Sequence, residues 1–302
     1  MNAQPRFDLQ SHSTRSDGAL EPAAVVAAAA AAGVQLLALT DHDTLAGVNE
    51  AIAAGNEHGV EVVPAIEISS IDDGGKDGHA RELHILGYGI DHADPALLST
   101  LERFLADREQ RTLRMADNLR GAGFELDTAA IDLRIAAGEP IGRPHLAEAV
   151  LSHPANSKRL HEESIDDIGS LIRGYLIEGK PAFALRVTPT VAEAVQAIHA
   201  AGGVAIWAHP FWDVEDENEV IAMIDRFRAL GLDGVEAFYV THTRAQTELL
   251  ASRCAELGLL STGSADFHGP ENRLFSRFLA FEAYGLQARL GPIYSADSSA
   301  SR

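Results

Sequence analysis

Five histidines and three carboxylates recur at or near the ends of predicted strands in this 302-residue sequence. They are His12, Asp17, His42, Glu67, His84, His209, Asp266 and His268. Neutral imidazoles mixed with carboxylates suit zinc, manganese or iron ions, whereas an all-oxygen set would suit magnesium or calcium. Eight ligands are too many for one tetrahedral ion, so the pattern predicts two or three divalent ions bridged by a carboxylate. Multinuclear sites of this kind hydrolyse phosphate esters.

Each of these residues, taken alone, has a simpler explanation. A single buried histidine is more often a hydrogen-bonded core residue than a metal ligand, and Asp17, in a Ser-Asp-Gly run, could be a turn residue. Their joint recurrence at strand ends favours a metal site. It does not do so for Asp43, which we interpret as a helix N-cap. We interpret the other eight of the 13 histidines as structural or solvent-facing, with His145 as the exception.

The strands that carry these residues alternate with helices, which is typical of an α/β fold. Strands are predicted at 6–9, 34–40, 60–69, 82–90, 203–208, 232–239 and 259–263, and helices at 22–33, 44–58, 188–201, 220–230 and 244–257. The first 90 residues are predicted to form one parallel unit. Because parallel strands in a barrel deliver their carboxyl ends to one face, distant residues would meet there. The pattern predicts a (β/α) barrel, with an open doubly wound sheet as the alternative.

Amphipathic charged segments interrupt this alternation and divide the chain. We predict a first part of the barrel at 1–93, a helical cap insertion at 94–186, a second part of the barrel at 187–290 and a flexible tail at 291–302. In the insertion, Arg108, Arg111 and Arg114 recur at helical spacing, which predicts a solvated helix face. Lys180 and Arg186 are weaker candidates for a pocket that binds an anion.

The composition limits the partners and the setting. With 24 Lys+Arg and 44 Asp+Glu, the formal charge of −20 argues against a protein that binds long DNA or RNA through its overall field. Ions at the cluster would instead give a small phosphate ester a local positive site. The single cysteine, Cys254, excludes an internal disulfide and favours a reducing, cytoplasmic setting. The small apolar run at 23–32 is too short to span a bilayer, so no membrane anchor is predicted. The oligomeric state is left open.

Seven motifs occur in a fixed order along the chain. They are Phe7-Asp8-Leu9-Gln10-Ser11-His12-Ser13, Ser16-Asp17-Gly18, Thr40-Asp41-His42-Asp43, Glu67, Leu83-His84-Ile85-Leu86-Gly87-Tyr88, Ala208-His209-Pro210 and Ser264-Ala265-Asp266-Phe267-His268-Gly269. Together they resemble the motifs of the PHP (polymerase and histidinol phosphatase) family of phosphoesterases, over about residues 5 to 270. The resemblance implies a distorted (β/α)7 barrel with a metal cluster at the carboxyl ends of its strands.

The same resemblance implies a ligand set. His12, Glu67 and Asp266 would hold one ion, Glu67 would bridge to a second ion held by His84 and His209, and Asp17, His42 and His268 would hold a third. Manganese, zinc or iron are the expected metals, and magnesium also fits. Gln10 stands where the family usually has the first histidine of a His-x-His pair, and an amide oxygen is a weaker ligand than imidazole. We predict that the first ion is retained, with Gln10 or water completing its ligands; a weakened site is the alternative.

The insertion bears on the substrate. Arg143-Pro144-His145 resembles the motif with which the nucleotide-hydrolysing branch of the family reaches a substrate phosphate, and Arg suits that role by its bidentate geometry. A plain helix start with proline in the first turn is the alternative. The implied reaction releases the 3′-phosphate of 3′,5′-bisphosphonucleotides or trims short 5′-phosphorylated RNA from its 5′ end. Metal-activated hydroxide would attack phosphorus, with His209 or Asp266 as proton donor to the leaving group.

Two other functions fit the same motifs. A histidinol-phosphate phosphatase shares the barrel and the metal motifs, and a catalytically silent PHP module would keep the fold without turnover. The length of the insertion and its Arg143-His145 pair favour nucleotides, and Gln10 is the feature that favours the silent module. Three aromatic residues near strand ends are predicted either as core or as a site for the base. They are Phe211, Trp212 and Tyr239.

Overall fold

A computed structural model describes residues 6–74, 80–186 and 189–294 of the chain. The described residues form two compact units, one from the residues up to 100 together with those from 189 onward, and one from residues 101–186. We call the first the barrel unit and the second the helical unit. Helix α3 (Pro95–Gly121) begins in the barrel unit and continues in the helical unit.

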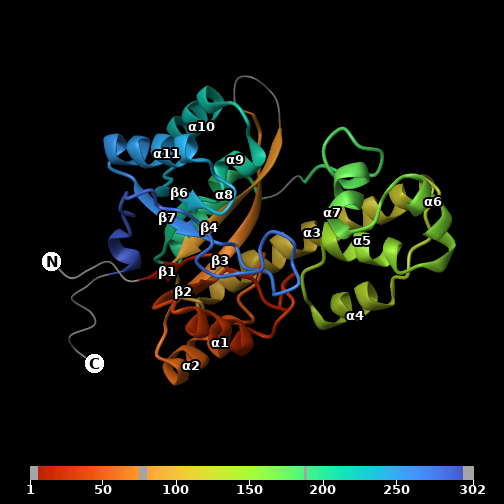
Figure 1. Ribbon diagram of the computed structural model, residues 1–302, viewed down its shortest axis with the longest axis horizontal. Helices are drawn as coiled ribbons and strands as arrows, with labels where there is room; N and C mark the ends of the chain where they lie inside the picture. Colours follow the sequence, from red (N-terminus) through yellow and green to blue (C-terminus); the bar gives the residue numbers. More distant parts are fainter. Residues whose placement is uncertain (1–5, 75–79, 187–188, 295–302) are drawn as a thin grey trace. The chain divides into compact units, whose positions relative to one another are not determined.

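Seven strands of the barrel unit form one sheet whose spatial order is the order of the chain (Figure 1). They are β1 (Phe7–Asp8), β2 (Leu36–Leu39), β3 (Glu61–Asp72), β4 (Arg81–Tyr88), β5 (Val204–Trp207), β6 (Gly234–Tyr239) and β7 (Leu260–Ser264). The Leu9 amide donates to the Gly263 carbonyl, and the His12 amide donates to the Phe267 carbonyl. These bonds join the first and last strands, so the barrel is nearly closed. The predicted seven-stranded barrel is confirmed, and the open sheet is wrong.

Strand β4 departs from the parallel unit that the sequence predicts for the first 90 residues. The pairs β1–β2, β2–β3, β5–β6 and β6–β7 are parallel, whereas β4 is antiparallel to both β3 and β5. The chain between β3 and β4 spans only residues 73–80, and a parallel crossover needs a dozen or more residues. Strand β4 therefore returns beside β3, where its His84 pairs with Ser69.

Helices cover the strands of the barrel unit. They are α1 (Pro22–Ala32), α2 (Val48–His58), α8 (Val191–Ala200), α9 (Pro210–Asp213), α10 (Glu217–Ala229) and α11 (Arg244–Leu257). Helix α2 packs on β3, α8 on β3, β4 and β5, and α11 on β6 and β7. Helices α1 and α2 end at Gly33 and Gly59, each in the left-handed conformation that only glycine adopts without strain.

The alternation of side chains along β2 explains how the barrel unit divides its core. Leu36 and Ala38 pack in one cluster of buried apolar residues, and Leu37 and Leu39 pack in another with residues of α1 and α2. Successive strand side chains point to opposite faces, so one short strand serves both layers. Near the other end of the chain, Ile293 of the 3₁₀ helix η4 (Gly291–Ile293) is buried in the first cluster. The prediction of a tail beginning at residue 291 is therefore wrong for 291–294, and 295–302 lie outside the described residues.

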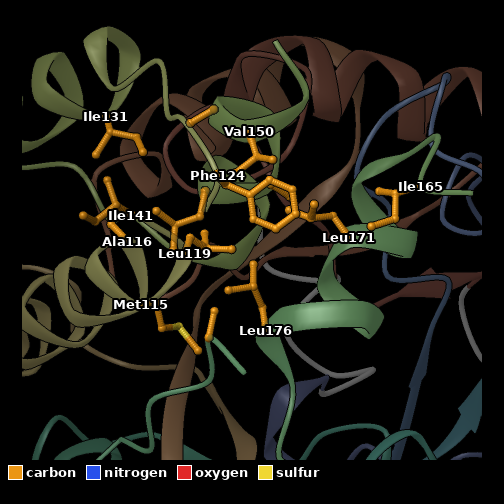
Figure 2. Packing of buried hydrophobic residues seen from close by; sticks show 14 of the residues in the cluster. Met115, Ala116, Leu119, Phe124, Ile131, Ile141, Val150, Ile165, Leu171 and Leu176 are labelled. Carbon is orange, nitrogen blue, oxygen red and sulfur yellow. The ribbon is translucent and has the colours of Figure 1, made fainter. Parts of the chain in front are cut away.

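The helical unit has a core of its own. Its elements after α3 are α4 (Ala129–Ala137), α5 (Arg143–Leu151), η2 (Pro154–Asn156), α6 (Ser157–Glu162), α7 (Ile168–Leu171) and η3 (Ile172–Leu176). Figure 2 shows Leu119 of α3 packed with Phe124, Val150 and Leu176 in one apolar cluster. Over the described parts of the chain, no helix is both long and apolar enough to cross a membrane.

Two arginines of α3 correct the prediction of a solvated face. Arg108 and Arg111 are buried, with exposed fractions of 7% and 4%, whereas Arg114 is exposed. Arg108 Nε donates to the Ile141 carbonyl at 2.7 Å, and Arg111 Nε donates to the Ala184 carbonyl at 2.8 Å. Helical spacing alone could not show that these guanidinium groups tie non-helical segments to α3.

Replacing Leu119 with alanine is expected to destabilise the helical unit by about 2–5 kcal/mol, because the side chain is fully buried and a cavity would remain. The matched control is Leu133→Ala, since Leu133 is 72% exposed and the same truncation there should cost less than about 0.5 kcal/mol. Urea denaturation with hydrogen exchange read over α4 to α7 measures both values. Equal effects in the two variants would contradict the packing described.

Candidate metal centre

The carboxylate of Glu67 lies at the centre of a cluster of imidazoles. Glu67, in β3, is fully buried. Its Oε1 lies 2.6 Å from His84 Nδ1 and 3.4 Å from His209 Nε2. Its Oε2 lies 3.0 Å from His12 Nε2 and 3.8 Å from His42 Nδ1. Both oxygens of this carboxylate therefore lie beside imidazole nitrogens, which are donor atoms that metals bind.

Two aspartates complete the cluster. Asp266 Oδ1 lies 3.1 Å from His12 Nε2. The Asp17 carboxylate lies 3.6 Å from Nε2 of His42 and 3.6 Å from Nε2 of His268. The rings of His12 and His268 stack at a centroid distance of 4.3 Å. The structure thus brings together all eight residues that the sequence singles out.

Three groups of these residues offer donor atoms that all lie within 4.8 Å of one another. The groups are His12, Glu67 and Asp266; His42, Glu67 and His84; and His12, Asp17, His42 and His268. The first group is the set implied for the first ion. The second group contains His42 with Glu67 and His84, whereas the resemblance implies His209 at this position. His209 Nε2 lies 3.4 Å from Glu67 Oε1.

The backbone is strained where it delivers two of these residues. His209 follows β5 with φ 29°, and Asp266 follows β7 with φ 52°. A residue with a side chain in this left-handed region costs about 1–3 kcal/mol and persists only where surrounding contacts hold it. Gly18 meets a different constraint, because a Cβ there would lie 2.2 Å from the His12 carbonyl oxygen. The loop that carries Asp17 can therefore approach His12 only with glycine at position 18.

Unsatisfied donor and acceptor atoms show that the cluster fits cations. His12 Nδ1, His42 Nδ1, His209 Nδ1 and Asp266 Oδ1 are buried without a hydrogen-bond partner. Each buried polar atom left unpaired costs about 1–3 kcal/mol. Imidazole nitrogens and carboxylate oxygens are the atoms that divalent transition metals bind. The residues present therefore fit divalent ions.

The ionisation states suit the same ligands. Burial opposes the charge on Glu67, but His42, His84 and His12 outweigh it and hold its pKa well below the ordinary value. Asp266 has its pKa lowered to about 2, because His268 and His12 outweigh the effect of burial. Burial lowers the pKa of His42 to about 3. Ionised carboxylates and a neutral imidazole are the forms that bind a metal.

Two other histidines behave differently. Burial disfavours a charge on His12, but the neighbouring carboxylates of Asp266 and Glu67 raise its pKa well above the ordinary value. The pKa of His209 is also raised, because Asp213 and Glu67 outweigh burial. A metal that binds these rings would compete with their protons, because imidazole binds metals in its neutral form.

Comparison with known proteins identifies the family. The PHP domain family matches residues 8–129. A 5′-3′ exoribonuclease of Haemophilus influenzae is 35% identical over 88% of this chain and 90% of its own length. The chain belongs to the PHP domain family. The resemblance drawn from the motifs is confirmed.

Other relatives cover similar lengths. A 3′,5′-nucleoside bisphosphate phosphatase of Chromobacterium violaceum is 32% identical over 87% of each chain. A phosphoribosyl 1,2-cyclic phosphate 1,2-diphosphodiesterase of Eggerthella lenta is 33% identical over 88% of this chain and 95% of its own. A solved structure from Bifidobacterium adolescentis, described as a metal-dependent phosphoesterase, superposes with a TM-score of 0.72 at 26% identity, covering 90% of this chain and 91% of that one.

Gln10 takes the place of a usual PHP histidine in an orientation that the structure defines. Its Nε2 donates to Glu67 Oε2 at 2.8 Å. Its Oε1 lies 3.4 Å from Ser264 Oγ, and that hydroxyl also donates to Glu236 Oε1 at 2.6 Å. In this arrangement the amide supports the carboxylate of Glu67 and the amide oxygen faces Ser264.

Two buried acids next to the cluster, Asp41 and Glu236, were not singled out from the sequence. Asp41 accepts hydrogen bonds from Ser13 and Ser16, and Glu236 accepts from the His209 amide at 2.9 Å. Burial raises the pKa of Glu236 to about 8. The available signal was the acid itself, because Glu236 stands inside an otherwise apolar strand.

Two more buried residues hold the loop after β7. Asp8 accepts hydrogen bonds from the amides of Ala265 and Leu279, and burial raises its pKa to about 7. Tyr239 donates its hydroxyl to Asp266 Oδ2 at 2.7 Å. Asp8 therefore fixes the backbone beside Asp266, and Tyr239 fixes its carboxylate.

Asp43 corrects the prediction of a helix N-cap. Helix α2 begins later, at Val48, with Gly47 as its N-cap. Asp43 itself has φ 56° and its Oδ1 accepts a hydrogen bond from the Ser69 amide at 2.8 Å. The side chain therefore ties the end of β2 to β3, next to His42.

Arg143 and His145 lie in the helical unit, at the start of α5. Gly142 donates its amide to His145 Nδ1 at 3.1 Å, so the ring caps the first turn of this helix. A Cβ at Gly142 would lie 2.7 Å from Arg108 Nη2. Two arginines and a histidine thus gather at one helix N-terminus.

Replacing Gln10 with histidine is expected to leave the metal content per chain unchanged, because His12, Glu67 and Asp266 already offer three donors to the same position. Elemental analysis after dialysis against manganese or zinc measures it. The matched control is Glu67→Gln, which should lower metal affinity by about tenfold or more, since it removes the charge of the central carboxylate. Much higher metal content or turnover in Gln10→His would show that the natural site is weakened.

Proposed function

We propose that this chain is a metal-dependent phosphoesterase that acts on small nucleotides. It releases the 3′-phosphate of 3′,5′-bisphosphonucleotides and trims short 5′-phosphorylated RNA from its 5′ end. The observation that carries the proposal is the buried carboxylate of Glu67, with four imidazoles within 3.8 Å of its oxygens. The names of the relatives support it, because each names a phosphatase, a phosphodiesterase or a ribonuclease.

Two or three divalent ions form part of the proposal, with manganese, zinc or iron preferred and magnesium also suitable. The proposed ligands are His12, Asp17, His42, Glu67, His84, His209, Asp266 and His268, and Gln10 or water completes the first position. When bound, such ions lower the pKa of a coordinated water molecule to near neutrality and neutralise charge on the phosphate.

Asp266 and His209 are the two residues predicted to donate a proton to the leaving group. Asp266 is held ionised by His268 and His12, with Tyr239 donating to its other oxygen, so it orients and accepts rather than donates. The pKa of His209 is raised, but this ring is itself a proposed metal ligand and would give up its proton to a bound ion. We therefore assign the proton for the leaving alkoxide to neither of the two predicted donors, His209 and Asp266.

Arg143 and His145 are the proposed partners of a substrate phosphate. They stand at the N-terminus of α5, where backbone amides and the helix dipole favour an anion. Arg108 lies against Gly142 beside them and adds a second guanidinium. An arginine fork binds phosphate in two parallel hydrogen bonds, which fixes orientation as well as adding affinity.

A phosphate-release panel tests the proposed function. Metal-loaded protein should hydrolyse 3′,5′-bisphosphoadenosine and short 5′-phosphorylated RNA much faster than AMP or histidinol phosphate, and a chelator should abolish the activity until metal is restored. Efficient hydrolysis of histidinol phosphate alone would favour that alternative. A protein with neither bound metal nor turnover would be the silent module.

Arg143→Lys is expected to raise KM for 3′,5′-bisphosphoadenosine by about tenfold or more, because a point charge replaces a bidentate fork. Metal content should not change. Arg120→Lys is the matched control, since Arg120 lies on the exposed end of α3 and pairs with Asp117. An unchanged KM in Arg143→Lys would remove Arg143 from the proposed phosphate site.

A further inference from the structure

Trp212 exposes half of its surface in the segment that carries His209. Its exposed fraction is 50%, and it is the only aromatic residue among the exposed large apolar side chains of the described residues. It lies in α9, and its amide donates to the His209 carbonyl at 2.8 Å. Burying this indole would stabilise the fold, so its exposure one turn from a proposed metal ligand suggests another role.

A second aromatic ring lies between Trp212 and His268 of the cluster. Phe275 packs edge-on against Trp212 at a centroid distance of 5.6 Å. The same Phe275 ring lies 5.4 Å from the ring of His268 and 6.2 Å from that of Tyr239. One phenyl ring therefore separates the exposed indole from a proposed metal ligand.

The backbone holds Phe275 firmly in this place. The His268 amide donates to the Phe275 carbonyl at 2.9 Å. The Asn272 side chain accepts from the amides of Leu274 and Phe275, both at 3.0 Å. The Trp212–Phe275 pair is thus a pre-organised face, anchored on the segments that carry His209 and His268.

The charges that follow Trp212 in the chain bear on what this face binds. Acidic residues follow it directly in the chain. They are Asp213, Glu215, Asp216 and Glu217. They disfavour a phosphate at the indole, whereas a neutral aromatic ring can stack there in spite of them. In a nucleotide, the phosphate would bind at the metal centre, and the base is the neutral aromatic part that could stack on the indole.

We infer that Trp212, backed by Phe275, stacks on the nucleobase of the substrate while the phosphate occupies the metal centre. This deepens the proposed function and rests on it. Of the three aromatic residues near strand ends, Tyr239 is buried against Asp266 and Trp212 is the one open to a ligand. Stacking accepts any base, so the face selects nucleotides over phosphate esters without an aromatic ring.

Kinetics with two substrates separate stacking from a structural role. In Trp212→Leu, KM for 3′,5′-bisphosphoadenosine should rise by about tenfold, while KM for the abasic sugar bisphosphate and kcat for both should stay unchanged. Trp212→Phe should recover most of the loss, because it restores an aromatic face. Leu230→Ala, at a 44% exposed residue after α10, is the control and should change neither substrate.

Tryptophan fluorescence gives a second readout that needs no turnover. The chain has two tryptophans, and the other, Trp207, is fully buried beside Phe227. Titration with AMP should quench the emission of Trp212, and inorganic phosphate alone should not. In Trp212→Phe the AMP-dependent quenching should vanish while the emission of Trp207 remains.

The outcomes distinguish this inference from the proposed function. If the natural protein hydrolyses no nucleotide, the proposed function fails, and the AMP titration still tests whether the indole binds a base. A second outcome is that the natural protein hydrolyses nucleotides while Trp212→Leu shows the same ratio of nucleotide KM to abasic-substrate KM as the natural protein. In that case only the stacking inference fails. Equal quenching by AMP in Trp212→Phe would also overturn it.

Discussion

The burial of the Glu67 carboxylate is the constraint on which the barrel unit depends. An ionised carboxylate removed from water is stable only where hydrogen bonds or opposite charges compensate for its lost hydration. Here four imidazoles and the amide of Gln10 supply that compensation. These groups come from segments far apart in the sequence, so the carboxylate is satisfied only when the barrel is nearly closed. The arrangement that stabilises the Glu67 carboxylate is also the one that would bind cations.

The sequence predicts the site better than it predicts the path of the chain. Residues such as His42 and Asp266 were found because they follow apolar strands, and a barrel brings such positions to one face. His84 was found for a reason that is only partly right. It lies inside β4, and it reaches Glu67 because that strand runs antiparallel to its neighbours. Direction is not encoded in hydrophobic periodicity; the short connection at 73–80 was the available signal.

Some predictions were wrong because the same residue type can take several structural roles. Asp43 has the composition of an N-cap, but the helix begins at Val48 and the carboxylate binds a strand amide instead. Arg108 and Arg111 have the spacing of a solvated face, yet their guanidinium groups satisfy carbonyls of segments distant in sequence. Long-range hydrogen bonds of this kind decide burial, and local pattern carries no trace of them. Glu236 was missed for a different reason, because its local signal, an acid inside an otherwise apolar strand, was present and was not used.

Hydrogen bonds with neighbouring buried side chains explain how the strained residues hold their positions. His209 and Asp266 adopt positive φ values, and a conformation of this kind relaxes unless neighbouring bonds oppose it. Glu236 accepts the amide of His209, while Tyr239 holds the carboxylate of Asp266. Gln10 belongs to the same network through Ser264, and the hydrogen bond from its amide holds the Glu67 carboxylate in place. Gln10 therefore supports the rest of the cluster through Glu67, because hydrogen-bond partners of this kind set the orientation of the side chains that could bind a metal.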